Sequence, residues 1–555
     1  MLCLSFACVA TFGLAACGGD DDDSAGTPTG GSAASDASGG KTGGSIKTAY
    51  TSFPDYLDPA LSYTQEGWQT LWTVYTPLLT YPHKEGADGA TVVPGLAEDM
   101  PDISADGKTY TLKLRSGLKY SDGTPVKASD FEYAIKRTLN LESGGSSFYL
   151  GIEGAEKYVK AGKAKADISG IDANDQTGEI TIRLLKPDGR FPYILAMPFA
   201  SLVPQSTPFK NMTKDPPAGV GQYEFKNVRI NRGYDLVKVK TFNVPGQPVA
   251  KLDDIRIDIV KNRRRQTQDT IQNKIDYMND PPAADQLRDV RAQYTDKRYK
   301  EFVTNSTYYY FMNHRVAPFD KPEVRQAVEY AVDKRSLARL FGGLLEPGCN
   351  FLPPGMKGYE KIDPCPWGDP LAAPDVAKAK ALIKQAGVDG DSVTVFGNDE
   401  PESKSTTEYL SDVLNDIGFK AKPRIVEGSV YFQTVGNQKT KAQIGFANWF
   451  QDFPHPGNFF FLVDGKSIQS TNNQNFGNVD DPELNAIFSK AAENADIDAV
   501  ADDYAKADKL LVERAHVVPY GHRKLALFYS ERMNFEDCTV WHPVYNLDLT
   551  NLCLK

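Results

Sequence analysis

The chain has 555 residues, of which 41% are hydrophobic and 24% are charged, as is ordinary for a globular protein. This length suffices for roughly three to four domain-sized units with a large core. The formal net charge of -10, from 62 basic and 72 acidic residues, argues against nucleic acid as a partner.

The first 17 residues have the pattern of an export signal. Residues 2–16 form an apolar run that is too short to span a bilayer, and the run ends in small residues as "GLAAC". The sequence "LAAC" resembles the bacterial lipobox, whose cysteine, here Cys17, becomes the lipidated first residue of the mature protein. We therefore predict a signal peptide with a lipobox at residues 1–17. The alternative is a buried N-terminal segment with a chance cysteine.

Residues 18–44 contain five Asp, one Lys and no large apolar residue. Such a segment cannot bury enough apolar surface to offset the conformational entropy that it would lose on ordering, so we predict a flexible tether. No later run is long and apolar enough for a transmembrane helix. We expect an extracytoplasmic protein that is lipid-anchored to the outer face of the cell membrane or periplasmic.

The next part of the chain predicts mixed α and β structure. Residues 108–114 alternate between apolar and polar side chains, as in a half-buried strand, and residues 180–185 do the same after a turn signal. Between them, residues 124–141 show helical spacing. The apolar residues of one helix face are Phe131, Ala134, Ile135 and Leu139.

Two consecutive helices are predicted between residues 319 and 343. Asp320 is the expected N-cap of the first, with Glu323 three residues later as in a capping box. Asp333 is the expected cap of a second, shorter helix, which the pair Gly342 and Gly343 ends.

A βαβ unit follows. Residues 393–398 read as a strand, residues 402–417 as a helix and residues 419–426 as a second strand. Part of the chain is therefore expected to form an open α/β sheet.

Four cysteines lie beyond the first 17 residues: Cys349, Cys365, Cys538 and Cys553. Four cysteines allow three pairings, and we predict the two local disulfides because each encloses a short segment rich in turn residues. A metal site is the alternative, but it needs clustered Cys and His, and His542 near Cys538 is too little.

The stretch "ANWFQDFPHPGNFFF" (residues 447–461) gathers six aromatic side chains around Asp452, with no Lys or Arg. A carboxylate among aromatic residues requires a partner, because burying a charge is costly. The sequence raises the question of which cation pairs with Asp452. The alternative is that Asp452 caps a turn before Pro454.

Several ordered blocks resemble the family 5 extracytoplasmic solute-binding proteins, the oligopeptide, dipeptide and nickel receptors of ABC importers. The block at residues 95–137, "GLAEDMPDISADGKTYTLKLRSGLKYSDGTPVKASDFEYAIKR", is similar to the most recognisable segment of the family. "GVGQYEF" (residues 219–225) is similar to its Gly-x-Gly-x-Tyr turn, and "PFDKPEVRQAVEYAVDK" to its central helix. The resemblance extends over nearly all of residues 45–555. Small departures are Lys127, where a capping Ser or Thr is usual, and Gln222, where Pro is common.

The resemblance implies an α/β fold of the two-lobed periplasmic-binding-protein clamshell type (class II-like, cluster C), with an extra inserted domain. The lobes would close on the ligand by a hinge motion. Chain crossovers are expected near Asn313 and Arg523. The implied domains are lobe I (residues 45–72, 201–311 and 523–555), an accessory inserted domain (residues 73–200) and lobe II (residues 312–522).

The resemblance further implies a peptide ligand. In the peptide receptors, the acid of a "Trp-x-x-Asp-Tyr/Phe" segment holds the α-ammonium group of the ligand, and Trp449, Asp452 and Phe453 match that segment. The predicted ligand-binding residues are Asp452, Trp449, Phe450, Phe453, Asn313, Tyr63 and Asn398. Oligosaccharide is the second-ranked ligand. A metal chelate ranks third, because His455 is the only histidine in the aromatic stretch.

No enzyme motif supports a catalytic function. The sequence contains no Gly-x-Ser-x-Gly, His-Glu-x-x-His or Cys-x-x-Cys motif. With 72 acidic residues, the sequence does not exclude a pair of glycosidase carboxylates, but nothing marks one out. We therefore expect a monomeric binding protein without a cofactor that delivers its ligand to the permease subunits of an ABC transporter. A cell-surface hydrolase is the remote alternative.

Overall fold

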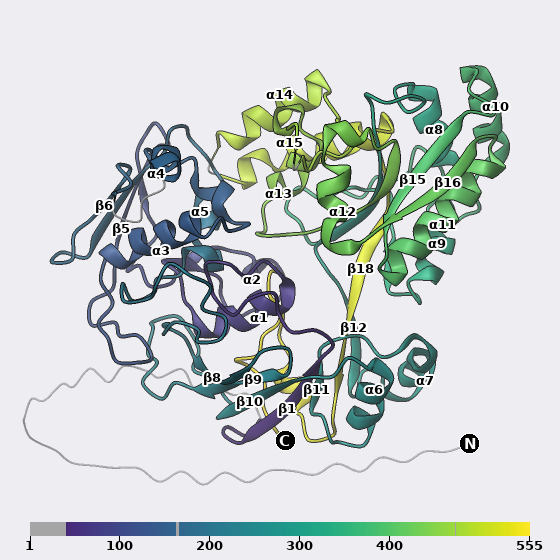
Figure 1. Ribbon diagram of the computed structural model, residues 1–555. Helices are drawn as coiled ribbons and strands as arrows, with labels where there is room; N and C mark the ends of the chain where they lie inside the picture. The colour runs from purple at the N-terminus through teal and green to yellow at the C-terminus, as the bar shows by residue number, and fades with distance from the viewer. Residues whose placement is uncertain (1–39, 162–165, 472, 495) are drawn as a thin grey trace, which may run out of the picture. The chain divides into compact units, whose positions relative to one another are not determined.

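A computed structural model describes residues 40–161, 166–471, 473–494 and 496–555 (Figure 1). Residues 1–39 lie outside this part, so the predicted signal peptide, Cys17 and most of the predicted tether are not described. The last residues of the predicted tether contact the folded part of the chain. Lys41 N donates to Leu554 O at 3.0 Å, and Gly43 N donates to Lys251 O at 2.7 Å.

The fold is mixed α and β, as predicted, and a twelve-stranded sheet runs through it. One part of this sheet carries a parallel pair, β1 with β10, in which Ser45 lies opposite Asp254. We call the part of the molecule around these strands lobe I. Its strands are β1 (Ser45–Tyr50), β8 (Tyr223–Arg229), β9 (Gly233–Lys238), β10 (Asp254–Ile259), β11 (Tyr277–Met278) and β12 (Tyr299–Val303), and its helices include α1 (Gln65–Val74), α6 (Arg263–Ile271) and α7 (Ala284–Tyr294).

The other part of the sheet contains the predicted βαβ unit, which the structure confirms. Strand β15 (Ser392–Asn398) pairs in parallel with β16 (Lys420–Val426), and α11 (Pro401–Asp416) connects them. We call the part around these strands lobe II. Its further elements are β13 (Ser306–Met312), β14 (Leu345–Pro347), β17 (Ile444–Phe450), α8 (Pro322–Ala331), α9 (Lys334–Leu340), α10 (Val376–Ala386), α12 (Gly428–Val435), α13 (Gly457–Phe460), α14 (Pro482–Ala492) and α15 (Ala501–Glu513).

One long strand, β18 (Val517–Tyr529), belongs to both lobes (Figure 1). Its first half pairs with β13 and β14, and its second half pairs with β12 and β11. Where it passes between the lobes, Thr304 N donates to Arg523 O at 2.8 Å, and Arg523 N donates to Ser306 Oγ at 2.9 Å. Arg523, near which a crossover is predicted, lies in this network, whereas Asn313 follows the end of β13. The predicted lobe boundaries stay a prediction.

A smaller, four-stranded sheet lies outside the large one, in the order β4-β5-β7-β6. Its central strands are the two that alternation predicts, and the buried face of α3 is the predicted one, with Phe131, Ala134, Ile135 and Leu139. The elements of this region are β2 (Leu79–Thr80), α2 (Gly86–Gly89), β3 (Val93–Pro94), β4 (Asp102–Ile103), β5 (Thr109–Lys113), α3 (Ser129–Asn140), α4 (Ala155–Ala161), β6 (Ile171–Ala173), β7 (Glu179–Arg183) and α5 (Phe191–Leu195).

One of the two predicted helix caps is wrong. Helix α8 begins at Pro322 with Lys321 as its N-cap, and no side chain caps it, so Asp320 does not form the expected capping box. Pro is favoured in the first helical turn because its missing N–H needs no partner there. The second cap is confirmed, since the Asp333 carboxylate accepts from Arg335 N and Ser336 N at the start of α9.

The four cysteines beyond residue 17 stand at disulfide distance in the two local pairs. The Sγ atoms are 2.03 Å apart in Cys349–Cys365 and 1.97 Å apart in Cys538–Cys553. The second pair joins α16 (Phe535–Cys538), past the short strands β19 (Trp541–His542) and β20 (Asn546–Leu547), to the C-terminal segment.

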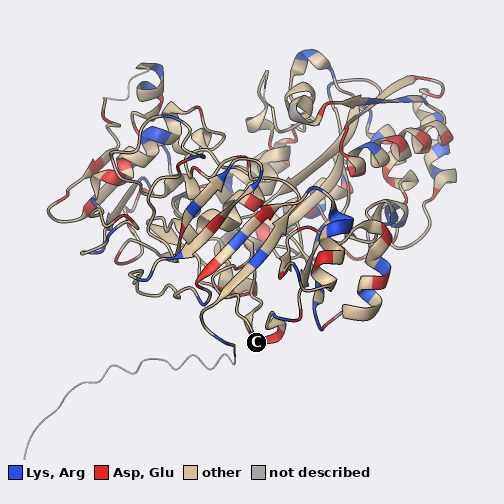
Figure 2. Ribbon diagram, turned by 60° about the horizontal axis from the view of Figure 1, so that its bottom comes forward, with Lys and Arg blue, Asp and Glu red and all other residues tan. Residues whose placement is uncertain are grey.

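Charged residues are mixed over the surface. Figure 2 shows basic and acidic residues interspersed along strands and helices alike, with no continuous basic face in that view. None of the helices in the described part of the chain combines the length and apolar character that a membrane span requires.

A buried ion pair ties the N-terminal segment of lobe I to helix α3. Arg137 donates to both carboxylate oxygens of Asp58, at 3.0 and 2.8 Å, and both side chains are almost completely buried. The Asp58 carboxylate also accepts from Ala60 N and Met212 N, at 3.1 and 3.0 Å. The pair therefore holds three segments of the chain together.

Removing the cation of this pair should be costly. We expect Arg137→Met to lower the free energy of unfolding by about 3–5 kcal/mol, because the Asp58 carboxylate then stays buried without its counter-ion. The double variant Asp58→Asn/Arg137→Met should recover part of the loss. Chemical denaturation measures both. The control is Lys113→Met, which breaks an exposed pair with Glu98 (3.0 Å) and should cost about 1 kcal/mol or less. Equal losses in Arg137→Met and Lys113→Met would contradict the assignment.

Candidate functional site

Segments of both lobes enclose a cavity of about 580 Å³, which we call the cleft cavity. This volume is in the usual range for small-molecule and peptide sites. Its walls are aromatic residues and neutral amides together with two acids, and none of the residues lining it is Lys, Arg or His. They are Tyr63, Thr64, Gln65, Glu66, Trp68, Phe432, Asn448, Trp449, Phe450, Gln451, Asp452, Gln474, Phe476, Leu525 and Val544.

The crossover strands position the acid of this cavity. Strand β17 lies beside β13, so that Phe450 is opposite Ser306 at the point where the chain enters lobe II. Just beyond β17, Gln451 N donates to Asn305 O at 3.0 Å, and Asn305 Nδ2 donates to Gln451 Oε1 at 3.0 Å. Asp452 is the next residue, so it is fixed directly beside the crossover.

Asp452 is buried, with 7% of its surface exposed. Its Oδ2 accepts from Asn458 Nδ2 at 2.7 Å, its own N–H donates to Asn458 Oδ1 at 2.8 Å, and the Tyr63 hydroxyl also hydrogen-bonds the carboxyl group. Burial raises the pKa of Asp452 to about 7, although both hydrogen bonds act to lower it.

No basic side chain in the described part of the chain pairs with Asp452. The carboxyl group also accepts no backbone N–H there, so it does not cap the turn before Pro454. The described part of the chain therefore supplies no counter-ion for Asp452. The arrangement is suited to receive a cationic group from a ligand.

The structure brings four of the predicted ligand-binding residues together in the cleft cavity: Tyr63, Trp449, Phe450 and Asp452. Phe453 lies outside the cleft cavity but lines the second cavity described below. It packs between Phe148 and Tyr193, with ring centroids 6.1 Å from each, and so contacts the region of the smaller sheet.

Asn313 and Asn398 line neither the cleft cavity nor the second cavity described next. Asn313 Nδ2 donates to Ala442 O at 2.8 Å, and the Asn398 side chain accepts from Glu400 N at 3.2 Å. Both side chains therefore hydrogen-bond backbone groups of the chain, at a distant residue for Asn313 and a neighbouring residue for Asn398. Their role in ligand binding stays a prediction.

Asp452 also lines a second cavity, of about 780 Å³. It shares Tyr63, Trp449, Asp452 and Gln474 with the cleft cavity. It contains one basic side chain, Arg190, which is bound at 2.8 Å by both oxygens of Asp188. Because its charge is already paired, Arg190 does not neutralise Asp452.

His455, the histidine of the aromatic stretch, is buried, and its Nδ1 accepts from Gly457 N at 3.0 Å. Burial lowers the pKa of His455 to about 3, so the ring is neutral. In the described residues, no group of three or more His, Cys, Asp or Glu is placed to hold a metal ion.

Sequence reasoning missed Glu66 and Asn458. Asn458 lies in the same aromatic stretch as Asp452, so its role as the amide partner of that acid had a local signal. Glu66 lies three residues after the predicted Tyr63, but no local pattern singled it out, because only the tertiary fold brings the start of α1 to the cleft cavity.

Comparisons with known proteins show the family and the fold of the chain. The model of the bacterial extracellular solute-binding proteins, family 5 (middle part), matches residues 91–471. The dipeptide-binding protein DppE of Bacillus subtilis (strain 168) is 26% identical over 511 residues, which cover 89% of each chain. The oligopeptide-binding protein OppA of the same organism is 25% identical over 445 residues, covering 77% of this chain and 78% of the relative.

Among solved structures, the clavulanic acid biosynthesis oligopeptide binding protein 2 superposes with a TM-score of 0.84. The identity is 24%, and the match covers 93% of this chain and 96% of that one. This likeness concerns the fold alone. It confirms the predicted fold class.

The buried acid should make the ligand-free protein less stable as the pH rises. A folded-state pKa near 7, against about 4 in the unfolded chain, means that the folded state binds the extra proton between these values. Stability from this group is therefore present below pH 4 and lost as the pH rises through 7. Asp452→Asn should be more stable than the wild type by up to about 4 kcal/mol at pH 8, with little difference at pH 4.

Chemical denaturation of ligand-stripped protein across this pH range measures the effect. The matched control is Asp412→Asn, at an exposed position of α11, which should show no such trend. A stability difference for Asp452→Asn that does not change between pH 4 and 8 would show that the acid is not held in its neutral form.

Proposed function

Because the chain belongs to the family 5 bacterial extracellular solute-binding proteins, we propose that it captures peptides in the cleft cavity and delivers them to the permease subunits of an ABC importer. Two relatives are named for dipeptide and oligopeptide binding, which supports this ligand class. The observation that carries the proposal is the buried, cation-free carboxyl group of Asp452.

The α-ammonium group of a peptide would be the counter-ion of Asp452. In the aromatic surroundings of Trp449 and Phe450 the dielectric is low, which strengthens a charged pair. Asn458 and Tyr63 already hold the carboxyl group in place, so little reorganisation is needed on binding. The approach of a cation would lower the pKa of Asp452 and favour its ionised form.

Lobe closure would complete the site. We propose the predicted division into lobe I, the accessory domain at residues 73–200 and lobe II at residues 312–522, with bending where β18 and the segment around Thr304 pass between the lobes. Under this proposal the protein acts as a monomeric, non-catalytic receptor on the outer side of the membrane.

Oligosaccharide is the second candidate ligand, because the cleft cavity offers aromatic platforms with neutral amides such as Gln65, Asn448 and Gln474. A sugar, however, would bring no positive charge to Asp452. A metal chelate is less well supported, since His455 is buried and hydrogen-bonded.

Blocking the amino group should separate these ligands. We expect N-acetylation of a bound peptide, or Asp452→Ala, to weaken binding by about 2–5 kcal/mol, because each leaves one member of a buried charged pair alone. This corresponds to roughly thirty-fold to several-thousand-fold in affinity. The two changes together should weaken binding by a factor much smaller than the product of the two separate factors. Isothermal titration calorimetry measures all three.

The control for this cycle is Gln474→Ala, which removes a neutral cavity residue and should affect the free and acetylated peptides equally. Equal binding of the acetylated and free peptides by the wild type would refute the role of Asp452.

We also propose that Cys17 carries the lipid anchor, which rests on the "LAAC" sequence. Expressed in a bacterial host, the full-length chain should fractionate with membranes, and Cys17→Ser should move it to the aqueous fraction. The control is Cys8→Ser, which lies in the leader and should leave fractionation unchanged. A Cys17→Ser protein that stays entirely with the membranes would disprove the anchor.

A further inference from the structure

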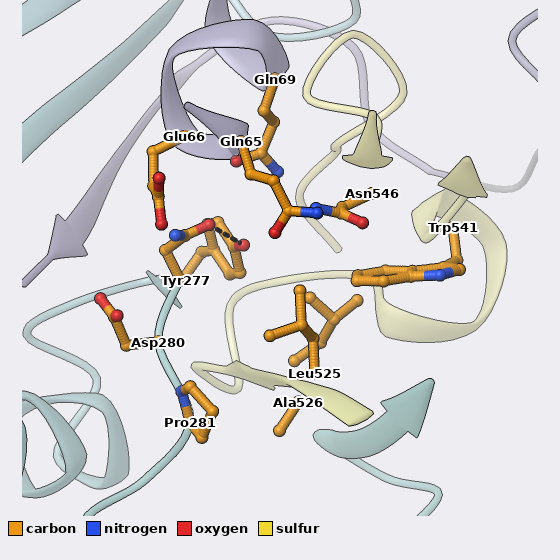
Figure 3. A pocket seen from close by; sticks show the side chains of 12 residues that line it. Gln65, Glu66, Gln69, Tyr277, Asp280, Pro281, Leu525, Ala526, Trp541 and Asn546 are labelled. Carbon is orange, nitrogen blue, oxygen red and sulfur yellow. Dashed lines mark hydrogen bonds between the residues drawn. The ribbon is translucent and has the colours of Figure 1, made fainter. Parts of the chain in front are cut away.

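A smaller cavity, which we call the side cavity, adjoins the cleft cavity and is drawn in Figure 3. The two share Gln65, Glu66 and Leu525 in their walls. The side cavity has a volume of about 50 Å³, room for several waters or for a group such as an ammonium or guanidinium. A ligand in the cleft cavity could therefore extend one side chain into it.

Two carboxyl groups face this side cavity, those of Glu66 and Asp280, and Trp541 lies across from them (Figure 3). None of the residues lining the side cavity is Lys, Arg or His. Asp280 accepts from Thr51 N at 2.7 Å. Within the described part of the chain, neither acid forms an ion pair with a basic side chain. Burial raises the pKa of Glu66, and the negative charges of Asp280 and Asp55 act in the same direction.

Glu66 also lies in the first turn of helix α1, where the helix dipole favours an acid. That effect is small and supplies no counter-ion. It also does not explain why a second acid, from the segment after β11, faces the same small space. The helix position therefore accounts for Glu66 only in part.

Taken together, the residues that line the two adjoining cavities include three acids, Asp452, Glu66 and Asp280, and no basic residue. Such a site favours a ligand with more than one positive charge and disfavours an acidic one, because like charges brought together cost free energy. The Trp541 ring, which stacks on Phe302 at 4.6 Å between centroids, adds an aromatic surface that attracts a cation.

We propose that the side cavity is a subsite for a second cation, in which Glu66, supported by Asp280 and Trp541, receives the amine or guanidinium of a Lys or Arg side chain. The inference rests on the proposed function, because it assumes that the α-ammonium group occupies Asp452. It identifies the ligands as basic peptides and makes Glu66 a specificity-determining residue.

A positional scan tests the subsite. Tetra-alanine is prepared with one Lys at each position in turn, and each peptide is matched by a twin with norleucine there, which has a similar length but no charge. Calorimetry with ligand-stripped protein measures both. We expect at least one position where Lys binds about tenfold or more tightly than norleucine, which is about 1.4 kcal/mol.

The variant Glu66→Gln should bring the ratio of the affinities for the Lys and norleucine peptides close to one. It should leave unchanged the factor by which N-acetylation weakens binding. Asp280→Asn should lower the ratio by a smaller factor. The matched control is Glu536→Gln, which removes one acid from an exposed position outside both cavities and should leave the ratio unchanged. If Glu66→Gln does not fold, Asp280→Asn carries the test.

The outcomes separate the two proposals. Equal binding of the Lys and norleucine peptides at every position overturns the subsite, and so does a preference for Lys that Glu66→Gln leaves unchanged. If Glu66→Gln does not fold, a preference that Asp280→Asn leaves unchanged overturns it. If acetylation still weakens binding in that case, the proposed function stands. If no peptide binds in either charge form, the proposed function is wrong and the subsite fails with it.

Discussion

The carboxyl group of Asp452 is removed from water without a positive charge to replace its hydration. A buried acid in this state is neutralised either by protonation or by a cation. The raised pKa of Asp452 reflects protonation. The surroundings also suit neutralisation by a cation, because Tyr63 and Asn458 hold the carboxyl group at the wall of an aromatic-lined cavity. The candidate site is organised around this unmet charge.

The sheet explains why the acid lies where both lobes can reach it. Strand β18 pairs with strands of both lobes, and β12 continues through Thr304 and Asn305 into β13. Asn305 is hydrogen-bonded to Gln451, the residue before Asp452, so the acid is fixed at the crossover rather than at the tip of a lobe. A change in the angle between the lobes would therefore alter access to Asp452, while its hydrogen bonds with Asn458 stay within one segment.

Local patterns in the sequence predicted local structure well. Alternation gave the central strands of the smaller sheet, helical spacing gave the buried face of α3, and the Asp333 cap was identified from its position before α9. The Asp320 cap was wrong because Pro322 in the first turn of α8 takes the place of a side-chain cap. Glu66 was missed although Tyr63, three residues earlier, was predicted. No local pattern marks Glu66, because it meets the cleft cavity only through contacts between segments far apart in the chain.

The most direct test of the account is the identity of the compound that the protein retains. Protein purified from its producing cells is mildly denatured, and the released molecules are identified by mass spectrometry with and without amine-reactive labelling. The account predicts peptides with a free amino terminus and an excess of Lys and Arg. Neutral sugars, metal chelates or amino-blocked peptides recovered in stoichiometric amounts would contradict it.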